Sequence, residues 1–304
     1  MIIGFIGITN TSINLISNLI LTRNEVEFLI IDNNFLRLNQ IIEEFNSIID
    51  YGRHKNKINF TNYQNLEKAD ILIIEPKQNQ APGMNLTDQA IENAEWIYKT
   101  GFLVRNSNFN GITFILGYYN SILCKIFSST SGLVGKKVFG IGTILENIYF
   151  NMLLKKTNSD LAKTANLLIL GDQGNSFLIN QDFKNNEITD KNNKIFDKLI
   201  QKINEKSLEK IIRKTAENWL LASILLDILL DIFQQKQSFF LINSWVESFY
   251  NIKNDFFTIP VKIDLSGQIE TKNINLNKQD QQKLIQFMWK KDELNTLIDK
   301  YLLK

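Results

Sequence analysis

The first half of the chain alternates short apolar runs with amphipathic stretches, and this alternation limits the possible folds most strongly. The apolar runs are typical of buried strands and cover residues 2–6, 26–31, 69–74 and 112–116. The helical patterns between them cover residues 12–21, 35–49 and 86–100. Strands that alternate with helices indicate parallel βαβ units. We therefore expect an α/β fold with a Rossmann-type, doubly wound parallel sheet.

The pattern changes after about residue 142. A helical pattern begins at Ile144 and leads to an apolar strand over residues 166–170 and a polar loop over residues 171–175. The remaining elements are expected as helices at 192–205, 207–233 and 280–303 and strands at 238–243 and 256–265. The sequence thus predicts a Rossmann-type domain at 1–142, followed by an α+β second domain at 143–304.

Composition excludes several classes of function. The 304 residues carry a formal net charge of +2, which gives no strong field for nucleic acid or an anionic membrane. The single cysteine, Cys124, and the single histidine, His54, argue against a disulfide framework, a metal site and a Ser-His triad. Asp227 and Asp231 interrupt the longest apolar run, and the N-terminus lacks the basic segment of a signal peptide. We expect a cytoplasmic chain.

The first strand is followed by a turn that partly matches a phosphate-binding motif. Residues 7–12 read GITNTS, where a dinucleotide site has G-x-G-x-x-G. Gly7 can make the tight turn and Ser12 is small, but Thr9 puts a branched side chain where the pyrophosphate approaches the backbone. Asp32 ends the second strand, where a ribose-binding carboxylate belongs. Alternatively, Asp32 is a turn residue and the hydroxyls merely cap a helix.

A second loop has the position of an active-site loop without its usual chemistry. The stretch LILGDQGNSF, residues 168–177, is typical of a strand that enters a polar loop, where folds often place functional residues. The loop offers the Asp172 carboxylate and the Gln173 and Asn175 amides. None of these groups titrates near neutral pH.

The order of the motifs resembles the lactate/malate dehydrogenase family, most closely its L-2-hydroxyisocaproate dehydrogenase type. "FLIIDNN" resembles the second strand with its ribose-binding acid, and "APGMNLTDQAIENAEWI" the mobile substrate loop and the helix after it. "KKVFGIGTILENIYF" is similar to V-I-G-x-G-T-x-L-D-x-x-R, and "LGDQGNS" to the catalytic L-G-E-H-G-[DN]-S. "FFTIPVKIDLSGQIE" resembles the late strand pair, so the match runs nearly end to end.

The resemblance implies that the catalytic positions have changed. Gln173 stands in place of the histidine that exchanges the substrate proton, and Glu146 in place of its aspartate partner. Tyr149 replaces the arginine that holds the substrate carboxylate, Leu86 the loop arginine, and Tyr118 the asparagine after the fourth strand. An amide does not exchange a proton near pH 7, and a phenol lacks the guanidinium fork.

Other positions divide into retained and altered residues. Gln80 replaces a second basic loop residue, Lys77 replaces a glycine near the cofactor, and Tyr119 replaces a proline. The retained residues belong to the scaffold and are Gly7, Asp32, Asn93, Gly142, Thr143, Gly171, Gly174 and Pro260. Less specific interpretations stay open, in which Gln173 is solvated, Glu146 pairs with Tyr149, and Tyr118 and Tyr119 fill the former nicotinamide pocket.

We therefore expect that the family's NAD-dependent 2-hydroxyacid oxidation is lost and that NAD binding is weak or absent. We expect the chain to serve as a binding or assembly subunit. The alternative is an active NAD-dependent oxidoreductase on an uncharged or apolar carbonyl or alcohol, with Tyr118, Tyr149 or Glu146 as its acid. A third interpretation is a chain with no selected function.

The expected partners are a second copy of the chain or an active dehydrogenase paralogue. The apolar positions that suggest contact surfaces in the second helix and the helix after Thr143 are Phe35, Leu38, Ile41, Ile42, Phe45, Ile49, Ile148, Met152 and Leu153. Packing within the chain's own core would explain the same pattern.

Overall fold

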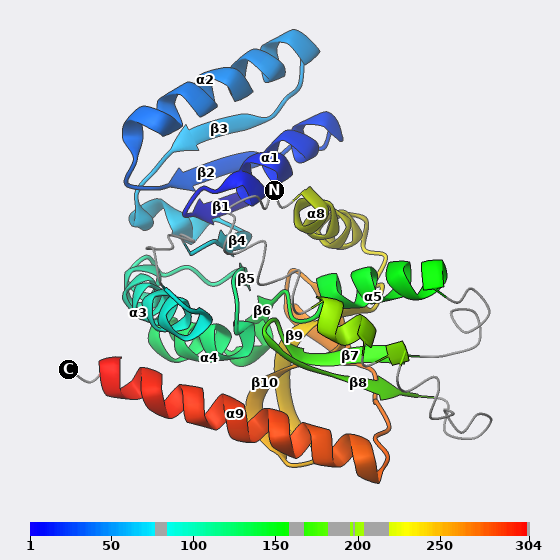
Figure 1. Cartoon of the computed structure of the whole chain (residues 1–304). Coiled ribbons are helices and arrows are strands. Elements are labelled where there is room, and N and C mark those ends of the chain that lie inside the picture. Colours follow the sequence, from blue (N-terminus) through cyan, green and yellow to red (C-terminus); the bar gives the residue numbers. More distant parts are fainter. Residues whose placement is uncertain (77–83, 158–166, 182–194, 197, 204–218, 303–304) are drawn as a thin grey trace.

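The computed structural model describes residues 1–76, 84–157, 167–181, 195–196, 198–203 and 219–302. Within these ranges the main sheet has the strand order β11-β10-β9-β6-β5-β4-β1-β2-β3 (Figure 1). Its strands are β1 (Ile2–Ile6), β2 (Glu27–Ile31), β3 (Lys57–Phe60), β4 (Ile71–Ile74), β5 (Ile112–Ile115), β6 (Val138–Gly140), β9 (Phe240–Phe249), β10 (Ile252–Asp264) and β11 (Gly267–Thr271). A separate hairpin consists of β7 (Leu167–Asp172) and β8 (Asn175–Asn180).

Helices cover both faces of the main sheet. They are α1 (Asn10–Leu21), α2 (Phe35–Gly52), α3 (Leu86–Arg105), α4 (Asn120–Ser131), α5 (Ile144–Thr157), α8 (Trp219–Gln234) and α9 (Lys278–Leu302). Short 3-10 turns lie at Tyr63–Lys68 and Gly135–Lys137. Alternate strand residues face opposite sides: in β4, Ile71 and Ile73 pack with α1, α2 and α8, whereas Leu72 and Ile74 pack with α3, α4 and α9.

The six strands from β3 to β6 are parallel, which confirms the Rossmann-type α/β fold. β4 is buried along its whole length, as a parallel strand between two helical layers requires. The strands β9, β10 and β11 extend the sheet antiparallel, and β9 joins it where Asn243 pairs with Gly140 of β6. The sheet therefore continues across residue 142, and the two-domain division stays a prediction.

The hairpin lies between two apolar clusters. On one side Leu167 and Ile169 of β7 pack with Phe150 of α5. On the other side Leu170 and Phe177 pack with residues of β10 and α9. Figure 1 shows α9 passing along the hairpin and on toward α3. The site near the hairpin turn is thus held by α5 on one side and α9 on the other.

Several elements differ from the sequence prediction. The strands β3, β6 and β8 and the helix α4 were not predicted, and β9 and β10 are longer than expected. The polar loop expected at 171–175 is shorter, because Asp172 ends β7 and Asn175 begins β8. Of the predicted helix at 192–205, residues 195–196 and 198–203 are helical, and the first part of the helix predicted at 207–233 lies outside the described residues. No helix in the described ranges is long and apolar enough to cross a membrane.

Candidate functional site

The turn of the β7–β8 hairpin carries Gln173, which the resemblance in the sequence predicts at the position of a catalytic histidine. Its side chain is 9% exposed, which rules out the interpretation of a solvated loop residue. The turn is tight: Gly171 and Gly174 have φ of +109° and +90°, and a Cβ on Gly171 would lie 2.5 Å from the Asn175 carbonyl oxygen. The Asn175 amide donates to the Phe287 carbonyl oxygen of α9 at 3.2 Å. The backbone around Gln173 is therefore well fixed.

Asp172, next to Gln173, is a buried carboxylate with several donors. It accepts hydrogen bonds from the Ser121 backbone N–H at 3.1 Å, from the Ser121 hydroxyl and from the Asn243 side-chain amide. Ser121 lies in the first turn of α4, whose N-cap residue Tyr119 makes no side-chain cap bond. Asp172 thus supplies an acceptor to that helix terminus. Burial raises the pKa of Asp172, while the Lys291 charge and these donors oppose the change.

Helix α5, which carries Glu146 and Tyr149, is attached to β7 through Asn147. The Asn147 amide donates to the Ile169 carbonyl oxygen at 2.8 Å, and its carbonyl oxygen accepts from the Ile169 N–H at 2.8 Å. The Thr143 hydroxyl donates to the same carbonyl oxygen at 2.6 Å. These bonds fix the position of the helix relative to the hairpin.

Glu146 and Tyr118 lie near each other in the core of the predicted site. Both are largely buried, and burial raises the pKa of Tyr118 well above its ordinary value, with the Glu146 charge as the second cause. The Tyr118 phenol therefore keeps its proton at neutral pH. Tyr149 is half-buried and packs against the apolar cluster that includes Phe150 and Leu154. Leu86 begins α3 as predicted, but the structure does not describe its side chain. Gln80 and Lys77 lie outside the described residues.

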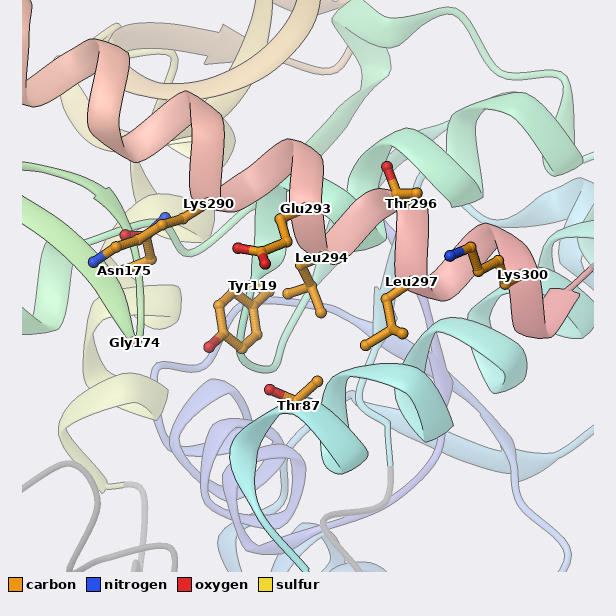
Figure 2. A pocket seen from close by; sticks show the side chains of 10 residues that line it. All are labelled: Thr87, Tyr119, Gly174, Asn175, Lys290, Glu293, Leu294, Thr296, Leu297 and Lys300. Carbon is orange, nitrogen blue, oxygen red and sulfur yellow. The ribbon is translucent and has the colours of Figure 1, made fainter.

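A cavity of about 730 Å³ adjoins this group on the side of α9. Figure 2 shows Tyr119 and Thr87 facing the helix, with Glu293, Leu294 and Leu297 opposite them. Its lining includes Gly174 and Asn175 of the hairpin but not Gln173, Glu146, Tyr149 or Tyr118. The cavity therefore lies beside the predicted catalytic positions.

The predicted cofactor residues meet at the turn between β1 and α1. Gly7 has φ of +78°, and a Cβ there would lie 2.3 Å from the Glu75 carbonyl oxygen. Thr9 is the N-cap of α1 and accepts from the Thr11 N–H at 3.3 Å. Asp32 accepts from the Ile8 N–H at 3.0 Å and the Asn34 N–H at 2.9 Å. These contacts agree with the interpretation of Asp32 as a turn residue.

Glu75, which the sequence reasoning did not identify, also occupies this turn. Its carboxylate accepts from the backbone N–H of Ser12 at 3.2 Å and from the Ser12 hydroxyl at 2.6 Å. The side chain of Glu75 is 2% exposed. A dinucleotide needs the N–H groups of this turn and helix terminus for its phosphates. Because a carboxylate already accepts from Ser12, the residues of the turn do not fit that cofactor.

No metal centre is evident in the described ranges, where no three or more histidine, cysteine, aspartate or glutamate side chains are grouped to hold an ion. Cys124 is fully buried in α4, as expected for a core thiol, and burial raises its pKa.

Comparison with curated proteins gives lactate dehydrogenases. The L-lactate dehydrogenase of Mycoplasma mobile is 19% identical over 251 residues, which cover 77% of this chain and 76% of that protein. The L-lactate dehydrogenase of Priestia megaterium is 24% identical over 236 residues, 73% of each chain. No protein-family model matches the sequence.

Comparison with solved structures gives the same group of folds. A lactate dehydrogenase from a Medee basin deep-sea metagenome library has a TM-score of 0.82 at 18% identity and covers 98% of each chain. The lactate dehydrogenase of Eimeria maxima with NADH and oxamate has a TM-score of 0.77 at 13% identity and covers 99% of this chain and 96% of that one.

The parallel sheet, its antiparallel extension and the hairpin at the site define a Rossmann-type dehydrogenase fold. The structural matches extend over nearly the whole chain, and the two sequence matches cover more than two thirds of it. The chain is similar in sequence to L-lactate dehydrogenases, at low identity, and shares the fold of lactate and malate dehydrogenases, which supports the resemblance in its sequence.

Proposed function

We propose that the chain keeps the fold of the lactate/malate dehydrogenases without their 2-hydroxyacid chemistry, and that it serves as a binding or assembly subunit. The observation that carries the proposal is Gln173, a buried amide in a tight turn, which the resemblance aligns with the proton-exchanging histidine. A primary amide can donate a hydrogen bond to a carbonyl oxygen, but it cannot serve as an acid or a base near pH 7.

The neighbouring positions support the same conclusion. Tyr149 offers no charge to a substrate carboxylate, and its ring packs against an apolar cluster. A general acid-base group is worth roughly 10²–10⁴ in rate, and a preorganised charge stabiliser about 10²–10³. These effects are not additive, but the combined changes at Gln173, Tyr149 and Leu86 leave no useful 2-hydroxyacid oxidation.

The proposal includes weak or absent binding of NAD. Thr9 stands at the second glycine position of the motif, and its hydroxyl caps α1 through the Thr11 N–H. Its branched side chain occupies space that the pyrophosphate of a dinucleotide needs close to the backbone.

The alternative, an oxidoreductase that acts on an uncharged substrate, needs a proton donor other than Gln173. Buried Glu146 and partly buried Tyr118 are the two candidates that lie near each other. Because the pKa of Tyr118 is raised, its phenol is a weaker acid than an ordinary tyrosine, and this favours the non-catalytic proposal.

The apolar stripe on α2 packs within the chain's own core, which is the alternative that the sequence left open. Leu38, Phe45 and Ile49 are buried in the chain's own core, and Ile41 and Ile42 pack against it. Support for self-association therefore comes from other side chains of α2: Leu36 is 85% exposed and Tyr51 is 95% exposed.

On α5, Ile148 and Leu153 are partly buried against core clusters, whereas Met152 is exposed. We infer a homo-oligomer, with an active dehydrogenase paralogue as a further candidate partner. The small net charge favours protein partners over nucleic acid or a membrane, in a cytoplasmic setting.

The loss of chemistry is tested by restoring residues. Gln173→His alone should leave the reduction of 2-oxo acids by NADH at the level of the unchanged chain, because the carboxylate anchor is still missing. Gln173→His combined with Tyr149→Arg is the matched second variant. If the single variant reached about 10 s⁻¹, the turnover of an ordinary enzyme, the rest of the site would be intact and the proposal wrong.

Co-assembly is tested by expressing the tagged chain together with a lactate dehydrogenase of the same cell. Recovery of both proteins at a fixed ratio after size exclusion would support the paralogue as partner. If the dehydrogenase is absent from the purified fraction, that partner is excluded and only self-association is left.

A further inference from the structure

We propose that Glu75 is a built-in occupant of the dinucleotide phosphate position, and that its carboxylate excludes the cofactor phosphates from the first turn. The inference deepens the proposed function, since it explains the weak or absent binding of NAD by one contact. It concerns only cofactor binding and does not depend on what Gln173 does.

The backbone brings Glu75 to the turn. It follows β4 directly, and β4 pairs in parallel with β1, with Ile74 opposite Ile6. The Glu75 N–H donates to the Ile6 carbonyl oxygen at 2.9 Å, which extends the pairing one residue beyond the end of β4. Because a Cβ on Gly7 would lie 2.3 Å from the Glu75 carbonyl oxygen, only glycine allows this close approach.

The side chain of Glu75 then reaches the N-terminal turn of α1. Its Oε2 accepts from the Ser12 N–H at 3.2 Å and from the Ser12 hydroxyl at 2.6 Å. Helix α1 has no acidic residue of its own in its first turn. The positive end of the helix dipole therefore acts on a carboxylate supplied by a different element.

Two further N–H groups of the turn also have internal acceptors. The Ile8 N–H donates to Asp32 and the Thr11 N–H to the Thr9 hydroxyl oxygen. An incoming pyrophosphate would have to break the bonds to Glu75 and would meet two carboxylates, Glu75 and Asp32, at the turn. Both the loss of donors and the repulsion between negative charges oppose its binding.

The experiment measures the dissociation constants of NADH and of ADP by calorimetry for the full-length chain and three variants. Glu75→Ala removes the occupant, Glu75→Gln removes its charge but keeps an acceptor for Ser12, and Glu67→Ala is the control. Glu67 is an exposed acid in the turn at Tyr63–Lys68 and has the same charge as Glu75.

We expect Glu75→Ala to tighten the binding of both ligands at least about tenfold, Glu75→Gln to give a smaller gain, and Glu67→Ala to give none. Circular dichroism checks folding, and Glu75→Gln decides the outcome if Glu75→Ala does not fold. The inference is wrong if the unchanged chain binds NADH with a micromolar constant, or if folded Glu75 variants bind no more tightly than Glu67→Ala. Turnover of a 2-oxo acid, in contrast, would overturn the proposed function.

Discussion

Asp172 and Gln173 are neighbours in the hairpin turn but have different roles. We propose that Gln173 stands at the position of a lost catalytic group, whereas Asp172 supplies acceptors to Ser121 of α4 and to Asn243 of β9. Burial raises its pKa above the ordinary value, so its charged form is the costly one in the folded state. A raised pKa in the folded chain means that folding favours the protonated acid.

Replacing Asp172 with asparagine tests this effect on stability. The contribution of a protonated Asp172 is fully present below pH 3.8, its ordinary pKa, and is lost as the pH rises through the raised pKa of the folded state. The free energy of unfolding of the unchanged chain should therefore fall, relative to that of Asp172→Asn, over this interval. Urea unfolding across the pH series measures the difference, with Asp50→Asn at an exposed site as control. A difference that does not vary with pH would contradict the raised pKa.

The sequence identified some residues of the candidate site and missed others for physical reasons. Gln173 and Glu146 were found because their motifs keep the family spacing. Glu75 was missed because its partner Ser12 is distant in sequence and meets it only through the pairing of β1 with β4. An acid directly after a buried strand is the signal that could have revealed it. Asn243 was missed because its position within β9 gives no sign of a buried partner.

At the scale of elements, α5 and the residue before it are attached to the hairpin by the side chains of Asn147 and Thr143. Asn147 pairs with both the N–H and the carbonyl oxygen of Ile169, as a neighbouring strand would. It thereby satisfies backbone groups of β7 that are buried. The position of Glu146 and Tyr149 relative to Gln173 follows from this contact.

Asn147→Ala should lower the free energy of unfolding by about 1–3 kcal/mol, because it removes the acceptor of the buried Ile169 N–H, while Thr143 still donates to the Ile169 carbonyl oxygen. Asn151→Ala, one helical turn further on the exposed side of α5, is the control and should change stability by no more than about 0.5 kcal/mol. Urea unfolding of both variants gives the comparison. Equal effects would show that Asn147 does not fix α5 to β7.

Element prediction succeeded where burial imposed a clear apolar pattern and failed where polar contacts determined the structure. β1, β2, β4 and β5 were predicted because each consists mainly of apolar residues. Helix α4 was missed because its cap is the distant Asp172, which replaces a local signal. β8 was missed because the turn before it consists of only Gln173 and Gly174 and resembles a longer loop in the sequence.

At the scale of the whole molecule, the sheet connects segments that the sequence suggested as separate domains. β9 and β10 continue the sheet past β6, and α9 returns to contact α3. Some apolar side chains are exposed on the surface of the molecule, including Leu36 and Tyr51 of α2. Such side chains are candidates for a contact between copies of the chain.

Light scattering after size exclusion should give a mass above the 35.3 kDa of a single chain. Leu36→Glu combined with Tyr51→Glu should lower that mass, because two charges would enter the proposed contact. Glu43→Gln on the same helix is the control and should leave the mass unchanged. A single-chain mass for the unchanged protein at tens of micromolar would contradict self-association.

The central claim is that this chain keeps the fold of the lactate and malate dehydrogenases without their hydride-transfer chemistry. Its most direct test mixes the purified, unchanged chain with NADH and, in turn, pyruvate, oxaloacetate and 2-oxoisocaproate, and follows the loss of NADH absorbance. We propose that Gln173 exchanges no proton and that Glu75 excludes the cofactor phosphates, and on that proposal the rate should equal that of the mixture without protein. Turnover on the order of 10 s⁻¹ with any of these acids would contradict the claim.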